Sequence, residues 1–195
     1  LFFGISTNYS FDLNNSNKFI VKIETAVKHH IKYCNIISET IKSSAKVRGT
    51  GIALRTPAYI QSKIENNNAV IATVNEKFAG FCYIEIWGHG KYVAHSGLIV
   101  HPDFRGVGLA KKIKKLTFKH SLSKYPKAKI FGITTSLAVM KINSDLGYKP
   151  VTFSELTDDD EFWIGCKTCK NYDILTRTNR SMCLCTGMLH ENKII

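Results

Sequence analysis

The stretch LIVHPDFRGVGLAKKIKK, residues 98–115, decides the fold. A short apolar run ends at a proline, a turn containing Gly106 and Gly108 follows, and apolar residues recur at helical spacing from Leu109. The sequence therefore predicts a strand, a glycine turn and the first turn of a helix. Such a helix end carries unpaired backbone N–H groups and a partial positive charge, so it suits a phosphate. Arg105 adds a guanidinium that can bind a phosphate through two hydrogen bonds.

The spacing within this stretch narrows the kind of phosphate site. Arg105-x-x-Gly108-x-Ala110 follows a strand that ends in Val100-x-Pro102. This pattern resembles the acyl-CoA-binding segment of the GNAT superfamily of N-acetyltransferases. It is not a Walker loop, which requires Gly-Lys-Ser/Thr, and it is not the dinucleotide pattern GxGxxG. The alternative is a plain tight turn between a core strand and an amphipathic helix.

The resemblance implies a fold and an acyl donor. The fold is an α/β (α+β) GNAT fold, in which a mixed central sheet flanked by helices is splayed around acyl-CoA. The pantetheine arm of acetyl-CoA is expected along the strand end and its pyrophosphate on the turn. The residues assigned to the donor in this way are Leu98, Ile99, Val100, Arg105, Gly106, Val107, Gly108, Leu109 and Ala110.

Hydrophobic periodicity predicts elements in the order that the family has. Thr56 is expected to cap the second helix, with Pro57 in the first turn. The elements expected are a strand at 19–24, a helix at 26–46, the helix from Thr56, strands at 70–74, 78–87 and 92–100, a helix at 107–122, a strand at 128–134, a helix ending at 147 and a strand at 148–153.

Three parts of the chain follow from this order. Residues 1–18 are rich in asparagine and serine and predict a loosely ordered leader. Residues 19–153 are the part that the resemblance covers, and they are expected to form the GNAT core. Residues 154–195 are an extension with four cysteines, packed on the same domain, with Thr157 as a candidate helix cap.

The catalytic groups are less directly predicted. Strand alternation places Ala94 and Ser96 on the substrate side, where the family often carries a base, and turns His95 the other way. Glu85 on the neighbouring strand and His89 in the following turn are therefore the candidate bases. The family's thiolate-protonating tyrosine falls at position 143, where this chain has asparagine. Water, Tyr148 or another residue must then protonate the thiolate.

Two arginines flank the glycine-rich loop that, in this fold, overhangs the acceptor. Arg48 and Arg55 are candidates for binding an acceptor carboxylate through two hydrogen bonds. The stretches SAKVRGTGIA and TFSELTDDDEFW are similar to small stand-alone bacterial acetyltransferases associated with arginine biosynthesis. That resemblance implies glutamate as acceptor. A surface role for both arginines stays open.

The cysteines of the extension have spacings typical of a metal site. Cys166-x-x-Cys169 and Cys183-x-Cys185 supply four thiols, which suits tetrahedral zinc. Reduced packing thiols and a redox function are the alternatives. We expect a cytoplasmic protein, which argues against disulfides.

Composition and charge limit the partners. The chain has 195 residues, 44% of them hydrophobic, and lacks an apolar run of the about 20 residues that cross a membrane. Its net charge of +12 fits an anionic coenzyme, and nucleic acid is disfavoured. The expected partners are acyl-CoA and a small amine-bearing acceptor, with a homodimer left open. A protein lysine or N-terminal acetyltransferase, a non-catalytic GNAT-like module and a succinyl or other short acyl donor also stay open.

Overall fold

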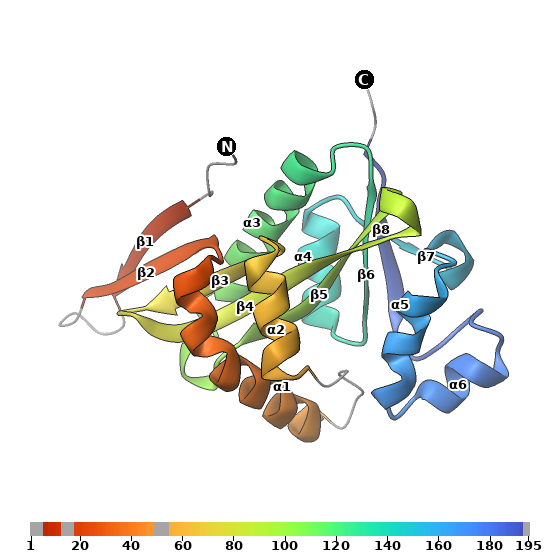
Figure 1. The fold of residues 1–195 in the computed structure, drawn as a ribbon, viewed down its shortest axis with the longest axis horizontal. Helices are drawn as coiled ribbons and strands as arrows, with labels where there is room; N and C mark the ends of the chain where they lie inside the picture. The colour runs from red at the N-terminus through yellow and green to blue at the C-terminus, as the bar shows by residue number, and fades with distance from the viewer. Residues whose placement is uncertain (1–5, 13–17, 49–54, 193–195) are drawn as a thin grey trace. The chain divides into compact units, whose positions relative to one another are not determined.

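The computed structural model describes residues 6–12, 18–48 and 55–192 (Figure 1). Over these residues it has a mixed eight-stranded sheet, ordered β1-β2-β3-β4-β5-β6-β8-β7, as the GNAT resemblance implied. The strands are β1 (Ser6–Asp12), β2 (Lys18–Thr25), β3 (Ala69–Val74), β4 (Lys77–Trp87), β5 (Tyr92–Val100), β6 (Lys129–Thr134), β7 (Lys149–Val151) and β8 (Thr186–His190).

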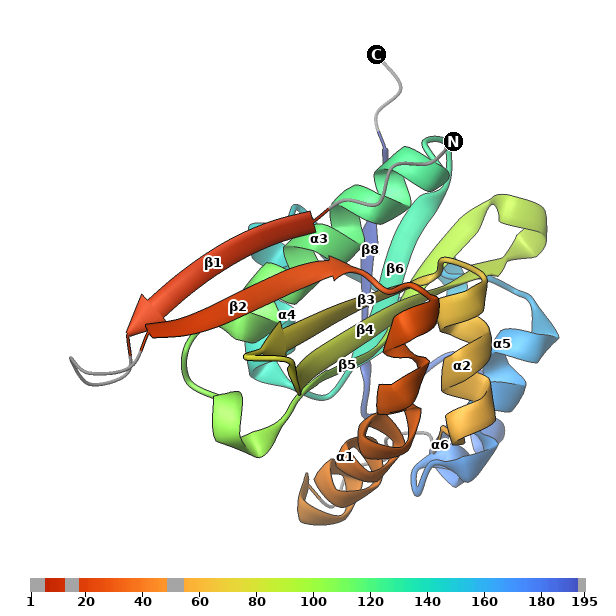
Figure 2. The same cartoon turned by 60° about the vertical axis from the view of Figure 1, so that its left-hand side comes forward.

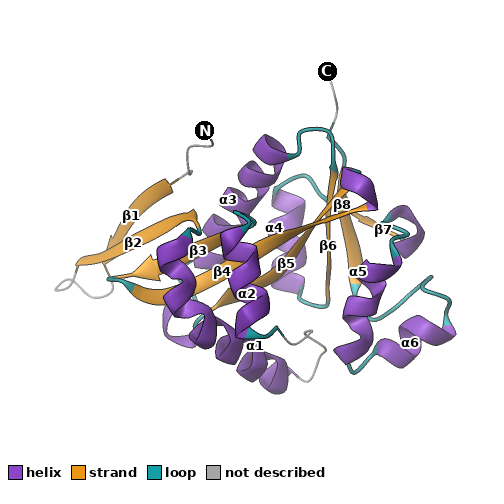
Figure 3. Cartoon of the chain, viewed as in Figure 1, coloured by secondary structure: helices purple, strands orange, loops and turns teal. Residues whose placement is uncertain are grey.

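The described helices all lie between β2 and β8 along the chain (Figure 3). None of the described helices is long and apolar enough to cross a membrane. The α-helices are α1 (Cys34–Arg48), α2 (Pro57–Glu65), α3 (Leu109–Lys124), α4 (Leu137–Asp145), α5 (Asp160–Ile164) and α6 (Tyr172–Arg177). The short 3-10 helices are η1 (Lys28–Tyr33), η2 (Gly88–Gly90), η3 (Pro102–Phe104), η4 (Phe153–Glu155) and η5 (Gly165–Thr168).

The chain divides into two compact units, and β4, β5, α1 and α3 each contribute to both. The first unit comprises Leu1–Ile41, Arg55–Ile84 and Gly97–His120. The second comprises Lys42–Leu54, Glu85–Ser96 and Ser121–Ile195.

In the first unit, strands β1 to β4 pair in antiparallel order. Every residue of β3 is buried, which is typical of a strand covered on both faces. On one face α3 packs Leu109, Ile113 and Leu116 against the strands. Helix α2 lies on the other side of β3 and β4 and buries Ile60 and Ile64 (Figures 1 and 2).

The N-terminal segment differs from its prediction. Residues 6–12 form β1, which pairs with β2 along its whole length from Ser6↔Glu24 to Asp12↔Lys18, so the expected loosely ordered leader is wrong over these residues. The parts of the leader at 1–5 and 13–17 lie outside the described residues. Polar residues dominate the segment, but edge strands gain most of their stability from main-chain hydrogen bonds, which composition does not reveal.

In the second unit, β6, β8 and β7 pair in antiparallel order, and β5 joins β6 in parallel. Phe131, Phe153, Trp163, Leu175 and Leu189 form the core. Helix α5 begins after Asp159, whose Oδ1 accepts the N–H of Glu161 at 3.1 Å, so Asp159 and not the expected Thr157 is the cap.

Candidate functional site

The turn between β5 and α3 has a backbone conformation that favours glycine at two positions. Gly106 has φ +84° and Gly108 has φ +75°. Arg105 Nε donates to the carbonyl of Val100 at 3.1 Å, which ties the turn to the end of β5. A Cβ built on either glycine would meet no described atom within 4 Å, so the space above both is open to a ligand.

Helix α3 gives this turn a positive electrostatic character. The Gly108 carbonyl accepts the N–H of Lys112 at 3.3 Å, so the preceding N–H groups of the first turn have no helical acceptor. No acidic side chain lies in the first turn to offset the positive end of the helix. Leu109 is buried, and Val107 and Phe104 pack against the same core, which fixes the turn in place. The arrangement can hold an anion such as a pyrophosphate.

Strand β5 leaves its parallel partner before it reaches the turn. Its register with β6 runs from Tyr92↔Lys129 to Ala94↔Phe131, whereas β5 continues to Val100. Gly97 then has φ +64°, and a Cβ there would lie 2.3 Å from the Tyr83 ring, so only glycine permits this contact. The expected donor residues 98–100 follow directly, with Ile99 buried and its neighbours half-buried.

Arg55 belongs to a cluster of cations and phenols in the first unit. Its Nε donates to Tyr83 Oη at 2.5 Å, and its guanidinium lies 5.1 Å from the Tyr59 ring centre. Lys63 Nζ lies 4.4 Å from the same ring and 5.7 Å from that of Tyr83. Ser38 Oγ donates to the Arg55 carbonyl at 2.7 Å. The half-buried guanidinium is thus held in place beside two phenol rings.

The model of the acetyltransferase (GNAT) family matches residues 41–134, which include β4, β5, the glycine turn and α3. Residues 41–134, just under half of the chain, are therefore similar to the GNAT family of acetyltransferases. None of the curated proteins compared with it matches.

Solved structures similar to this chain show the same fold at low identity. N-acetylglutamate synthase of Neisseria gonorrhoeae, complexed with coenzyme A and N-acetyl-glutamate, has a TM-score of 0.60 and 14% identity over 89% of this chain and 35% of that one. The protein yncA of Salmonella typhimurium, with its cofactor acetyl-CoA, has a TM-score of 0.62 and 17% identity. The match covers 90% of this chain and 95% of that one. Diaminobutyrate acetyltransferase of Paenibacillus lautus, with L-2,4-diaminobutyric acid and coenzyme A, has a TM-score of 0.61 and 10% identity. The match covers 90% of this chain and 97% of that one. The chain thus spans 35% of the synthase it resembles.

The other residues predicted for the GNAT reaction have different environments. Glu85 lies on β4 and is only 9% exposed. His89 is exposed in η2 with φ +54°, and the N–H of the preceding Gly88 donates to Asp159 Oδ2 at 3.1 Å, which anchors this turn. Arg48 is the last residue of α1, and its side chain lies outside the described part of the chain.

A buried polar chain involving His95 was missed at the sequence level. His95 Nδ1 lies 3.1 Å from Tyr148 Oη and its Nε2 lies 2.8 Å from Ser121 Oγ. The neutral tautomer protonated at Nε2 satisfies both bonds, with the phenol donating to Nδ1. Asn143 is also buried, and its Oδ1 has no hydrogen-bond partner among the described residues. The alternation of β5 could have indicated this buried position, because it turns the His95 side chain away from the expected substrate side.

The four cysteines of the extension come together in the second unit. Cys166, Cys169, Cys183 and Cys185 line one cavity, along with apolar side chains and Tyr172. Burial, with smaller effects from the other three thiols, raises the pKa of the Cys185 thiol to about 12. The remaining cysteines, Cys34 and Cys82, are buried packing residues, as predicted.

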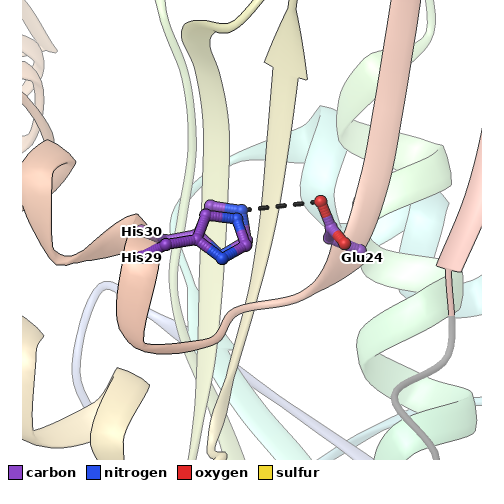
Figure 4. A group of neighbouring side chains, drawn as sticks. All are labelled: Glu24, His29 and His30. Atoms are coloured by element: carbon purple, nitrogen blue, oxygen red, sulfur yellow. Dashed lines mark ion pairs between the residues drawn. The ribbon is translucent and has the colours of Figure 1, made fainter.

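One further group of metal-ligand type lies in the first unit, where Glu24, His29 and His30 meet (Figure 4). His30 Nδ1 accepts the N–H of Val27 at 3.0 Å, so the proton of the neutral ring sits on Nε2, 3.5 Å from Glu24 Oε1. Lys22 Nζ lies 2.7 Å from that same oxygen. The His30 nitrogen nearest the carboxylate is therefore protonated, and a cation already pairs with Glu24, so this group does not suit a metal.

Proposed function

We propose that this chain transfers an acetyl group from acetyl-CoA to the primary amine of a small acceptor. The observation that carries the proposal is the turn at 105–110, where open space above Gly106 and Gly108 meets the N-terminus of α3. A pyrophosphate there would meet first-turn N–H groups, and Arg105 would add charge. The departure of β5 from β6 supports placing the pantetheine arm along Leu98, Ile99 and Val100.

The reaction needs one proton removed and one supplied. The amine nitrogen attacks the thioester carbon, the C–N bond forms, and the C–S bond breaks to release the coenzyme A thiolate. We propose Glu85 as the base that takes the amine proton, because it is held on a strand, with His89 in its exposed turn as the second candidate. Tyr148, bonded to His95, is our candidate for the acid that protonates the thiolate.

The acceptor we propose is an amino acid, with glutamate first. Arg55 supports this because Tyr83 and Tyr59 hold its guanidinium in place, and a guanidinium matches a carboxylate in shape and charge. Arg48 is the second candidate for that contact. The similar fold of N-acetylglutamate synthase is a further support. Acetylation of glutamate would place the chain in arginine biosynthesis, in the cytoplasm.

The test is an assay of free thiol release. The purified chain is incubated with acetyl-CoA or succinyl-CoA and with glutamate, other amino acids, diaminobutyrate or a lysine peptide. Release that requires acetyl-CoA and glutamate, and that falls by at least a hundredfold in Glu85→Gln with unchanged acetyl-CoA affinity, supports the proposal. Release only with the lysine peptide would replace it by protein acetylation. Binding of acetyl-CoA with no release for any acceptor would identify a non-catalytic module.

A further inference from the structure

The segment between β7 and β8 consists of short helices joined by loops (Figure 3), and it carries thiols from three places into one cavity. Cys166 lies in η5, Cys169 follows it, and Cys183 and Cys185 lie just before β8. We propose that these four thiols bind one structural zinc ion. This inference is independent of the acetyltransferase proposal, because every residue it uses belongs to the second unit and none to the glycine turn.

The orientation of residues 182–185 is the first support. Met182 and Leu184 are 62% and 61% exposed, whereas Cys183 and Cys185, which alternate with them, are half-buried and line the cavity. Packing alone would turn the larger apolar side chains inward, because a buried leucine contributes about 1.5–3 kcal/mol. The chain instead presents two thiols to the interior and leaves two large hydrophobic side chains in water. This arrangement is the one that a shared metal ligand site would require.

The backbone around the cavity is the second support. The N–H of Cys169 donates to the carbonyl of Cys166 at 2.8 Å, which forms a tight turn between the two thiols. The N–H of Asn171 donates to Cys169 Sγ at 3.4 Å. Cys183 Sγ in turn donates to the carbonyl of Asn171 at 3.8 Å, so Asn171 links the two pairs of cysteines. A backbone N–H directed at sulfur stabilises the thiolate, which is the form that binds a metal.

The choice of zinc follows from the ligand set. Four sulfur ligands and no oxygen favour zinc among the common divalent cations, and four-coordinate sites with sulfur are structural because no position is left for a substrate. Among the described residues, only Glu24, His29 and His30 bring three potential ligand atoms within 4.8 Å of one another. No three of the four sulfurs therefore all lie within 4.8 Å of one another, whereas a tetrahedral site with a Zn–S length of about 2.3 Å requires about 3.8 Å between every pair. Zinc would draw them together by side-chain rotation, and each thiol would lose its proton.

Metal content and cobalt binding test this proposal on the whole chain. Protein purified under reducing conditions without chelator should contain about one zinc per chain, the stoichiometry of a four-thiolate site. After removal of zinc, titration with Co²⁺ should give the intense visible bands of a tetrahedral cobalt thiolate complex, with an end point at one equivalent. Absence of zinc together with absence of these bands would overturn the proposal and leave the thiols as packing groups.

Paired variants locate the ion. The double variants C166S/C169S and C183S/C185S should each lose at least nine-tenths of the zinc and the cobalt bands. Cys34→Ala, which removes a buried thiol of the first unit, should keep both and serves as the control. Full zinc content in either double variant would contradict the site. Acetyl-CoA affinity should stay within about twofold in the double variants, so failure here is distinct from failure of the proposed function.

Discussion

Gly108→Glu is the most direct test of the glycine turn as the phosphate site. The glycine has φ +75° and no described atom within 4 Å of a Cβ, so the variant strains the backbone but meets no steric barrier. The strain in a left-handed conformation is about 1–2 kcal/mol. A carboxylate near the N-terminus of α3 offsets part of that, by roughly 0.3–1 kcal/mol. We therefore expect a folded protein that has lost about 1 kcal/mol of unfolding free energy.

The effect on acetyl-CoA is much larger. The new carboxylate occupies the open space where the pyrophosphate is expected, and two unit charges about 4 Å apart near a protein surface interact by roughly 4 kcal/mol. At about 1.4 kcal/mol for each factor of ten, repulsion of that size lowers the affinity about a thousandfold. Gly108→Ala introduces the backbone strain without the negative charge, so its affinity for acetyl-CoA should fall far less.

Calorimetric titration with acetyl-CoA measures this effect, and Gly90→Glu is the matched control. Gly90 has φ +87° and also no described atom within 4 Å, but it lies in η2, which has no helix following it. Both glutamate variants should unfold at similarly lowered temperatures. Only Gly108→Glu should lose acetyl-CoA. Wild-type affinity in Gly108→Glu, or an equal loss in Gly90→Glu, would refute the assignment of the turn.

Three further predictions concern charged side chains. Arg55→Ala should raise the KM for a carboxylate-bearing acceptor about ten- to a hundredfold, as expected for a charged hydrogen bond, while the KM for acetyl-CoA stays constant; steady-state kinetics that show equal changes in both would contradict the role. Burial lowers the pKa of Lys114 to about 8. Between pH 8 and 10.5 the unfolded chain therefore binds a proton at this lysine that the folded chain does not. The free energy of unfolding consequently rises with pH in that window, by roughly 3 kcal/mol. Denaturant unfolding should therefore show that the stability gap between Lys114→Met and wild type changes with pH; a constant gap would refute this. Burial, and then His29, lowers the pKa of His30, so wild-type stability should fall as pH drops from about 6.5, and thermal unfolding of His30→Asn should show a weaker dependence.

The sequence predicted best those elements whose signals lie within a few neighbouring residues. Strand β5 has the predicted bounds, Tyr92–Val100. Helix α2 begins as expected, because Thr56 Oγ1 accepts the N–H of Tyr59 at 3.2 Å and Pro57 occupies the first turn. In both cases, the chemistry that fixes the element comes from residues adjacent in sequence. The GNAT resemblance was confirmed by a family model whose matched residues, 41–134, include the glycine turn.

Features that depend on distant partners were harder to predict. The helix expected from residue 26 instead begins as the 3-10 helix η1, where the N–H of Val27 donates to the His30 ring. Strand β1 exists because β2 lies beside it. Neither the hydrophobic period nor the residue types of β1 carry information about that partner. At this edge of the sheet, main-chain pairing therefore decides the structure, and the strand propensity of the residues does not.

Tyr148, the proposed acid, depends on such distant contacts and lies at a different position from the tyrosine of the family pattern. The carbonyl of Asn143 accepts the N–H groups of Leu146 at 2.9 Å and Tyr148 at 3.1 Å, so the end of α4 fixes the backbone from which the phenol projects. The phenol then bonds to His95, 53 residues away, and His95 bonds to Ser121 of α3. The family pattern has its tyrosine at position 143, where this chain has the amide side chain of asparagine. The chain nevertheless buries a phenol five positions later, hydrogen-bonded to the imidazole of His95. This is why the loss of tyrosine at 143 does not by itself argue for a non-catalytic protein.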